Sequence, residues 1–181
     1  MDKDREIMMI TGRKNGDPEA LETLVRQMQK PIYNAAYRML GNPEEAADVT
    51  QTTFLKVFEN IQRFDPKHRL FSWTYRIAMN ESIDQLKRSK RTEPLREPPV
   101  SDAKSPQDDA VASQLSDEVQ ATLMELNEEH RAVITLRHFS ECSYEDISRI
   151  LDVPEKTVKS RLFTARRQLR NKLNQHGVFS A

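Results

Sequence analysis

The sequence has little glycine, a single cysteine and no long hydrophobic run. Four glycines in 181 residues form no glycine-rich phosphate loop, which argues against a nucleotide-binding α/β fold. Cys142 cannot form an internal disulfide, and four scattered histidines give no metal-ligand spacing, so we expect neither a metal nor a cofactor. No run reaches the roughly 20 apolar residues of a membrane span. The acidic start of the chain does not resemble a secretory signal, and we expect a cytoplasmic protein without membrane insertion.

The formal net charge of zero conceals three segments of different charge. Residues 1–91 carry 16 basic and 13 acidic side chains, 92–129 carry 2 and 10, and 130–181 carry 10 and 5. The chain is therefore an acidic segment between two basic bodies.

The acidic segment begins as a stretch with almost no apolar residues, and four of the nine prolines lie in it. Such a composition cannot bury enough surface to offset the entropy lost on ordering, so we interpret 92–114 as a flexible linker. The flanking bodies, 15–91 and 115–175, are each near the lower size limit for an independent core. Helical patterns fill both of them. The predicted fold class is all-α, with two small helical domains joined by a flexible acidic linker.

Capping residues predict where the helices of the first body begin and end. Asp17 precedes a proline and predicts the start of one helix, and Pro31 predicts the start of a second helix that ends at Gly41. Asn42 predicts the cap of a third helix, expected to run to about Arg63.

The apolar residues of this third helix do not all share one face. Its inward stripe comprises Phe54, Val57, Phe58 and Ile61. Val49 and Leu55 lie away from the stripe, on an otherwise polar face. Either they meet another helix of the same domain, or they belong to a surface that binds a partner.

The next predicted helix, capped by Ser72, and the loop before it combine basic and aromatic side chains. Basic groups neutralise phosphates and aromatic rings stack on unpaired bases, so together they suit melted or single-stranded nucleic acid. A simpler interpretation also stands, because Trp73 and Tyr75 at helical spacing are commonly core residues and a basic helix end complements the helix dipole. The residues concerned are Phe64, Phe71, Trp73, Tyr75, Lys87, Arg88, Lys90 and Arg91.

The second body contains a helix-turn-helix pattern over about 144–163. Two helices are expected before it, one led by Ser116 and one over about 128–139. The pattern itself is a short capped helix, a tight break and a longer basic helix, and residues 149–172 include eight basic and two acidic side chains. Phe163 projects from the cationic face, where it could make an apolar contact with a thymine methyl or a sugar. The alternative is that this basic face is simply exposed to solvent and includes one aromatic residue. By itself the motif indicates DNA binding and no narrower role.

Three segments together resemble the extracytoplasmic-function (group 4) sigma factors of bacteria, in the sigma-70 family. The helix of region 2 that binds core polymerase is similar to GNPEEAADVTQTTFLKVFENIQRFD. The segment of region 2 that melts promoters and recognises the minus-10 element is similar to FSWTYRIAMNESIDQLKRSKR. Region 4, with its helix-turn-helix, is similar to LNEEHRAVITLRHFSECSYEDISRILDVPEKTVKSRLFTARRQL. The segments occur in the family's order and cover most of 15–91 and 115–173.

The resemblance implies that one face of the third helix binds the clamp helices of the largest polymerase subunit. Asp48, Gln51 and Phe54 match the family's D-x-x-Q-x-x-F pattern, while Thr52 stands where an acidic residue is common. The implied polymerase-binding residues are Asp48, Val49, Gln51, Thr52, Leu55, Lys56 and Glu59.

The resemblance also implies two DNA-binding surfaces. The loop 64–72 and the helix after it would hold a base flipped out of the non-template strand. Holding this base would offset the cost of unstacking it, which is roughly a few kcal/mol. The implied minus-10 residues are Phe64, Lys67, Arg69, Phe71, Trp73, Tyr75, Asn80, Lys87 and Arg88. The implied minus-35 residues are Lys156, Thr157, Lys159, Ser160, Phe163, Thr164, Arg166 and Arg167. Lys156 replaces a common Gly and Thr164 a common basic residue, so we expect the preferred minus-35 sequence to differ from those of relatives.

The expected function is that of an alternative sigma factor with a role in stress response. It would bind core RNA polymerase, direct it to specific promoters and help to open the DNA, while polymerase performs the chemistry, so the chain is not expected to be an enzyme. The implied partners are the clamp helices and β flap of polymerase, promoter DNA and an anti-sigma factor. The linker would stay off the DNA, thread toward the RNA exit path and tether the two DNA-binding modules.

Two other classes of function compete with this one. A helix-turn-helix regulator that is not a polymerase subunit would explain 130–173 but would leave the third helix without a role. An enzyme acting on nucleic acid should show clustered carboxylates or a nucleophile, yet Asp48 and Glu59 are eleven residues apart and Cys142 has only His138 nearby. We therefore interpret Cys142 as a small packed residue, with redox sensing as the alternative.

Overall fold

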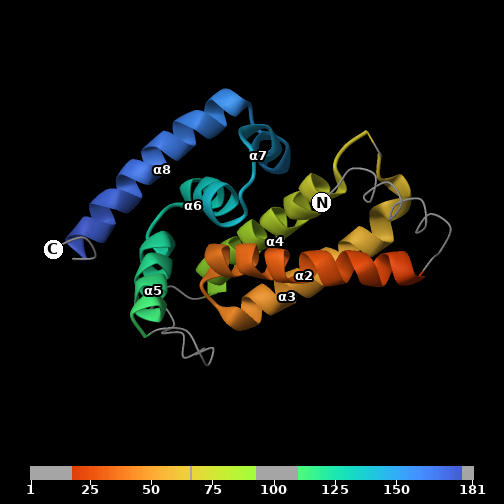
Figure 1. Cartoon of the computed structure of the whole chain (residues 1–181), viewed down its shortest axis with the longest axis horizontal. Coiled ribbons are helices and arrows are strands. Elements are labelled where there is room, and N and C mark those ends of the chain that lie inside the picture. The colour runs from red at the N-terminus through yellow and green to blue at the C-terminus, as the bar shows by residue number, and fades with distance from the viewer. Residues whose placement is uncertain (1–17, 66, 93–109, 177–181) are drawn as a thin grey trace.

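The computed structural model describes residues 18–65, 67–92 and 110–176, and every regular element in these ranges is a helix. This confirms the predicted all-α class. The first helical group comprises α2 (Pro18–Leu40), α3 (Pro43–Asn60), the 3-10 turn η1 (Ile61–Arg63) and α4 (Leu70–Thr92). The second comprises α5 (Ala110–Met124), α6 (Glu128–Ile134), the π-helical turn η2 (Thr135–Phe139), α7 (Tyr144–Leu151) and α8 (Glu155–Gln175). Figure 1 shows α2, α3 and α4 packed together, with α6, α7 and α8 on one side of them.

The helix α2 runs without a break through Pro31, so the prediction of two helices there is wrong. A proline inside a helix removes one backbone hydrogen bond and costs about 3 kcal/mol. Here a buried apolar stripe continues on both sides of the proline and offsets this cost. The stripe comprises Leu24, Met28, Ile32, Ala35, Ala36 and Met39. Gly41 ends the helix as predicted, at a φ of 71°, while the predicted cap Asp17 lies outside the described residues.

Asn42 caps α3 as predicted. Its Oδ1 accepts hydrogen bonds from the backbone N–H groups of Glu44 at 2.9 Å and Glu45 at 3.1 Å. The helical path continues through η1 to Arg63, which confirms the predicted end of this segment.

The buried sector of α3 is wider than the predicted stripe, because the helix packs against both α2 and α4. Val49 is only 6% exposed, so for this residue the first alternative holds: it packs within the domain and does not belong to a surface that binds a partner. Thr50 and Thr53 are buried as well, and each hydroxyl donates to the carbonyl four residues earlier at 2.7 Å. Leu55 is different, since 52% of it is exposed.

The helix α4 begins at Leu70, so Ser72 is an internal residue and not the N-cap. The helix has one buried face and one exposed face. Tyr75, Met79 and Ser82 are buried, whereas Asn80 and Asp84 are exposed.

In the second group, α5 begins at Ala110, six residues before Ser116 and inside the predicted linker, most of which lies outside the described residues. The helix expected over 128–139 is present, and its last turn is π-helical. The helix-turn-helix is confirmed as α7 and α8. Asp152 takes the left-handed conformation at the break, with a φ of 56°, and a reciprocal capping box between Ser143 and Asp146 starts α7.

The two groups pack on each other through α2 and α4, and Arg131 of α6 lies at their junction. The residue is 5% exposed, and its guanidinium donates to four backbone carbonyls, those of Met39, Leu123, Met124 and Leu126, at 2.6–3.0 Å. These carbonyls lie at or just beyond the C-terminal ends of α2 and α5, where helix dipoles favour a cation. Burial lowers the pKa of Arg131 to about 10, which still leaves it charged at neutral pH.

Candidate functional site

The first candidate surface is the exposed side of α3 with the groove beside it, here called the α3 face. A groove of about 680 Å³ lies between α2 and α3. Its lining is largely apolar and aromatic, and includes Val25, Tyr33, Gln51, Phe54, Leu55 and Phe58. Leu55 exposes apolar surface to water beside this groove, and a partner protein that binds here would cover that surface.

Most of the predicted polymerase-binding residues lie on the α3 face. Asp48, Gln51, Leu55, Lys56 and Glu59 are exposed and Thr52 is half-buried, whereas Val49 packs beneath the surface. Lys56 is also paired with Glu81 of α4, so its charge is partly committed within the domain.

The predicted minus-10 residues are divided between surface and core. Lys67, Asn80, Lys87 and Arg88 are exposed, Arg69, Phe71 and Trp73 are half-buried, and Phe64 and Tyr75 are buried. The aromatic rings pack in pairs, with centroids 5.0 Å apart for Phe64 and Trp73 and 4.5 Å apart for Phe71 and Tyr75. For Phe64 and Tyr75 this arrangement supports the core interpretation.

Tyr75 points toward the second helical group. Its phenol hydrogen-bonds Ser140, and burial raises its pKa to about 12. Cys142 lies two residues after Ser140. It is buried and donates its thiol hydrogen to the Ser140 carbonyl at 3.6 Å. Burial and the nearby Asp146 raise the pKa of the Cys142 thiol to about 12. The prediction that Cys142 is a packed residue is confirmed.

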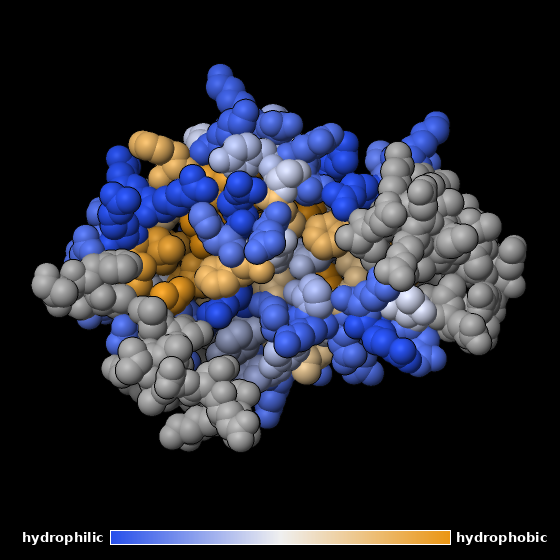
Figure 2. Space-filling model, in the orientation of Figure 1, coloured by the Kyte–Doolittle hydropathy of each residue, from blue (hydrophilic) through white to orange (hydrophobic). Residues whose placement is uncertain are grey.

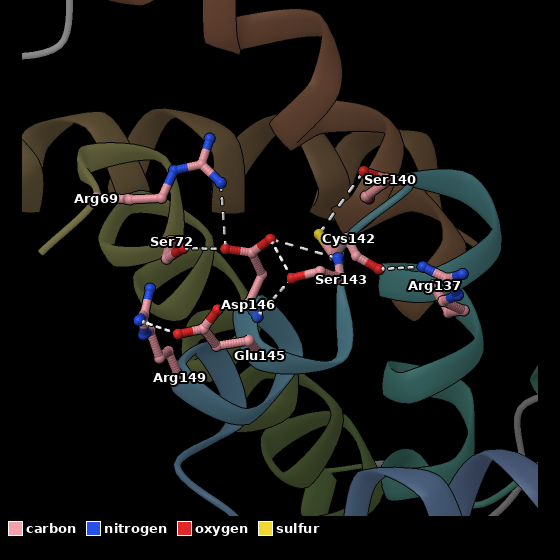
Figure 3. A network of polar contacts seen from close by, with 9 residues as sticks. All are labelled: Arg69, Ser72, Arg137, Ser140, Cys142, Ser143, Glu145, Asp146 and Arg149. Carbon is pink, nitrogen blue, oxygen red and sulfur yellow. Dashed lines mark hydrogen bonds and ion pairs between the residues drawn. The ribbon is translucent and has the colours of Figure 1, made fainter. Parts of the chain in front are cut away.

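Sequence reasoning missed a polar cluster in which the second helical group contacts α4 (Figure 3). The carboxylate of Asp146 on α7 lies between Ser143 of its own helix start and two α4-side residues, Arg69 and Ser72. The capping box S-x-x-D could have identified Asp146 as a helix cap. The α4-side partners could not be found in this way, because they lie more than 70 residues earlier in the chain.

The second DNA-binding candidate is the outward side of α8, here called the α8 face. The periodicity of this helix predicts an inward stripe of Val158, Leu162, Ala165, Leu169 and Leu173; all of these are buried except Leu169, which is half-buried. The residues Lys156, Lys159, Ser160, Phe163, Arg166 and Arg167 are exposed, and Thr157 and Thr164 are half-buried. Figure 2 shows hydrophilic side chains along the outer edge of α8, with apolar ones gathered toward α5 and α6.

Two contacts orient basic side chains of the α8 face. Arg166 donates through Nε to His138 Nε2 at 3.1 Å. Burial and the charges of Arg166 and Arg137 lower the pKa of His138, which favours the neutral imidazole that can accept this bond. The ammonium of Lys159 lies 5.7 Å from the ring centre of Tyr144. Phe163, which is 69% exposed, stands among these cations.

Within 18–65, 67–92 and 110–176, no group of three His, Cys, Asp or Glu side chains could hold a metal ion. None of the helices in the described part of the chain is both long enough and apolar enough to cross a bilayer.

Comparison with known proteins matches both bodies to one family. Residues 24–92 match Sigma-70 region 2 and residues 116–169 match Sigma-70 region 4. The ECF RNA polymerase sigma factor SigW of Bacillus subtilis is 36% identical, over 92% of this chain and 97% of that protein. SigE of Mycolicibacterium smegmatis is also 36% identical, over 92% and 67%. The sigma-E factor of Haemophilus influenzae is 31% identical, over 88% and 90%.

Two solved structures share the fold. CnrH, in complex with the cytosolic domain of CnrY, has a TM-score of 0.76 at 24% identity, over 96% of this chain and 99% of that chain. The sigma factor RpoE from Bartonella quintana, in complex with the anti-sigma factor NepR, has a TM-score of 0.72 at 22% identity, over 84% and 96%.

The two matched regions, in this order along the chain, define a sigma-70 family protein. Within that family, the chain belongs to the ECF RNA polymerase sigma factors.

Proposed function

We propose that this ECF sigma factor has three binding surfaces with different roles. The α3 face binds core RNA polymerase, α4 with the loop before it binds the minus-10 element, and the α8 face binds the minus-35 element. The observation that carries the proposal is the exposure of Leu55 beside the α2–α3 groove, directly after the residues that match D-x-x-Q-x-x-F. A helix-turn-helix regulator acting alone would leave this surface without a partner.

The chain directs polymerase to promoters and helps to open them, and it carries out no covalent step of its own. Lys87 and Arg88 at the end of α4 neutralise phosphates, and the half-buried Phe71 and Trp73 are the aromatic side chains on which an unpaired base can stack. This work takes place in the cytoplasm, where polymerase and the chromosome are. An anti-sigma factor holds the chain inactive; the structural similarity to RpoE bound to NepR supports such a partner.

The central experiment adds the purified chain to core polymerase. Transcription should begin at promoters of the chain's own genome, and start-site mapping after overexpression should identify those promoters. A chain that fails to bind core polymerase would contradict the proposed function.

Replacing Phe163 with Ala should weaken binding of the assembled holoenzyme to a promoter duplex by about 1–3 kcal/mol, because an apolar contact to the DNA is lost. Phe163 is exposed, so the fold should not change. Duplex binding is measured by fluorescence anisotropy, with core binding measured in parallel. An equal loss of core binding would show that the two modules are wrongly assigned.

Replacing Lys159 with Gln should act differently from the change at Phe163. A lysine that neutralises one phosphate releases about one counterion, so the slope of log affinity against log salt should fall by about one unit. The measurement is a salt titration of the same duplex. If the slope is unchanged, Lys159 does not contact a phosphate.

A further inference from the structure

We propose that His138 is a positioning residue for recognition of the minus-35 element. It holds the guanidinium of Arg166 in one orientation on the α8 face, in which Arg166 contacts a base edge and not only a phosphate. This inference rests on the proposed role of the α8 face in minus-35 binding.

The contact between the two side chains uses one nitrogen of Arg166 and leaves the other two for DNA. Nε of Arg166 donates to His138 Nε2 at 3.1 Å. Arg166 is exposed, and among the residues that the structure describes its two Nη groups have no partner. Arginine recognises guanine with two parallel N–H donors on O6 and N7, and the two Nη groups can supply both of them. A guanidinium already fixed through Nε loses less side-chain freedom when it binds a base.

The π-helical turn η2, which carries His138, is itself held in place. The backbone N–H of Cys142 donates to the Leu136 carbonyl at 2.9 Å, and Arg137 donates to the Cys142 carbonyl at 2.8 Å (Figure 3). The guanidinium of Arg137 also lies 5.1 Å from the ring centre of Tyr144. Because its own turn is fixed in this way, the imidazole can restrict the orientation of its partner on α8.

The hydrogen bond requires a neutral imidazole. Nε2 of His138 accepts only while the ring hydrogen is on Nδ1, and a second proton removes the lone pair that accepts. Burial and the positive charges of Arg166 and Arg137 lower the pKa of His138 from its ordinary value. The bond is therefore present at neutral pH and is lost as the pH falls through this lowered pKa.

Other ionisable side chains on the elements packed against η2, which are α2, α6 and α7, have partners of their own. These are Arg38 of α2 over the Phe139 ring, Glu129 of α6 with Arg161, His130 of α6 with Gln168, and Glu145 of α7 with Arg149. Arg166 and Arg137 are accordingly the charges to which the protonation of His138 responds.

Protonation of His138 changes two properties of the α8 face in opposite directions. The imidazolium adds a positive charge, which strengthens binding to DNA of any sequence. At the same time Arg166 loses its acceptor and is repelled by the new charge, so discrimination among minus-35 sequences falls. A residue that only stabilised the fold would not produce these two opposite effects.

The test measures a specificity ratio for the assembled holoenzyme from about pH 7.5 to about pH 5, a range that includes the titration of histidine. The ratio is the affinity for a promoter duplex obtained by start-site mapping, divided by the affinity for the same duplex with its minus-35 bases shuffled. Both affinities are measured by fluorescence anisotropy at one salt concentration. Titration of groups on core polymerase acts on both duplexes and cancels in the ratio.

In the unmodified chain the ratio should fall by about fivefold as the pH is lowered, because one exposed hydrogen bond and the base contact that it supports are lost. Affinity for the shuffled duplex should rise over the same range. His138→Gln should keep a high ratio at every pH, since the glutamine carbonyl accepts from Arg166 and does not titrate. His138→Ala should have the low ratio throughout. His138 is exposed, so neither change should affect the fold.

Two further variants separate positioning from other effects. His130→Gln is the matched control, because the His130 ring also contacts α8, at 2.8 Å from Gln168, but contacts none of the predicted minus-35 residues. Its ratio should depend on pH as in the unmodified chain. In an Arg166→Ala background, His138→Ala should cause no further loss of the ratio, since His138 acts through Arg166.

A ratio that is independent of pH in the unmodified chain would overturn the proposal. So would loss of the pH dependence in His130→Gln, or a further loss caused by His138→Ala in the Arg166→Ala background. Binding to core polymerase is measured on the same samples. A chain that fails to bind core polymerase contradicts the proposed function itself, whereas normal core binding with a ratio independent of pH contradicts only the role of His138.

Discussion

Replacing Leu55 with Asp should weaken binding to core RNA polymerase by at least about 2 kcal/mol, or roughly thirtyfold. Leu55 is 52% exposed and borders the α2–α3 groove, so its side chain can be covered by a partner but contributes little to the core. An aspartate there would bring a charge into an apolar contact, where it must lose its hydration. The affinity for labelled core polymerase is measured by anisotropy or by native gel shift.

Phe163→Asp is the matched control for this change. It also replaces an exposed apolar residue with an acid, but on the α8 face. It should leave core binding within about twofold of the unmodified chain and reduce only promoter binding. Unfolding curves for both variants should match the original, because neither residue is buried. Normal core binding by the Leu55 variant would remove the α3 face from the polymerase interface.

Local signals predicted most of the helical architecture. Asn42 and the Ser143–Asp146 pair cap helices through bonds to residues two or three positions away, and such signals can be read directly from the sequence. The predicted helix break at Pro31 is wrong because tertiary packing, and not a local signal, decides the structure there. Burial on both sides of the proline, which depends on where α3 and α4 lie, outweighs a local cost of about 3 kcal/mol.

The difference between local signals and contacts between distant segments also explains which residues of the candidate sites could be predicted. The outward residues of α8 follow from helical periodicity, since one face of that helix packs and the other does not. Periodicity left two alternatives open for Val49, and the packing of α3 against two neighbouring helices decides between them. Asp146 and Arg76 could not be predicted at all as partners of the other helical group, because their contacts depend on how the two groups pack.

The structure shows where acidic side chains outside the linker lie. The acidic linker was expected to stay off the DNA, and that remains a prediction. Acidic side chains outside the linker have a more specific arrangement, in which Asp146 pairs with Arg69, just before α4, and Asp152 pairs with Arg76 of α4. The helix-turn-helix is therefore basic on the outward side of α8 and acidic where α7 packs against α4.

Replacing Arg131 with Met should lower the free energy of unfolding by about 3 kcal/mol or more. The guanidinium is the donor to four carbonyls at the ends of α2 and α5, and methionine would fill much of its volume but donate nothing. The Leu123 carbonyl would keep the backbone N–H of Leu126 at 3.1 Å, while each carbonyl left buried without a donor costs about 1–3 kcal/mol, partly recovered by relaxation and by water. The measurement is urea denaturation at neutral pH, with the midpoint shifting and the slope unchanged.

Arg137→Met is the control for Arg131, because Arg137 gives one hydrogen bond to a carbonyl, that of Cys142, at 2.8 Å and is only half-buried. Its loss should cost about 1 kcal/mol. Arg131→Lys should fall between the two, since an ammonium keeps the charge but cannot reach four acceptors with the planar geometry of a guanidinium. If Arg131→Met costs no more than Arg137→Met, then water replaces the guanidinium at these helix ends and the junction between the two helical groups does not depend on it.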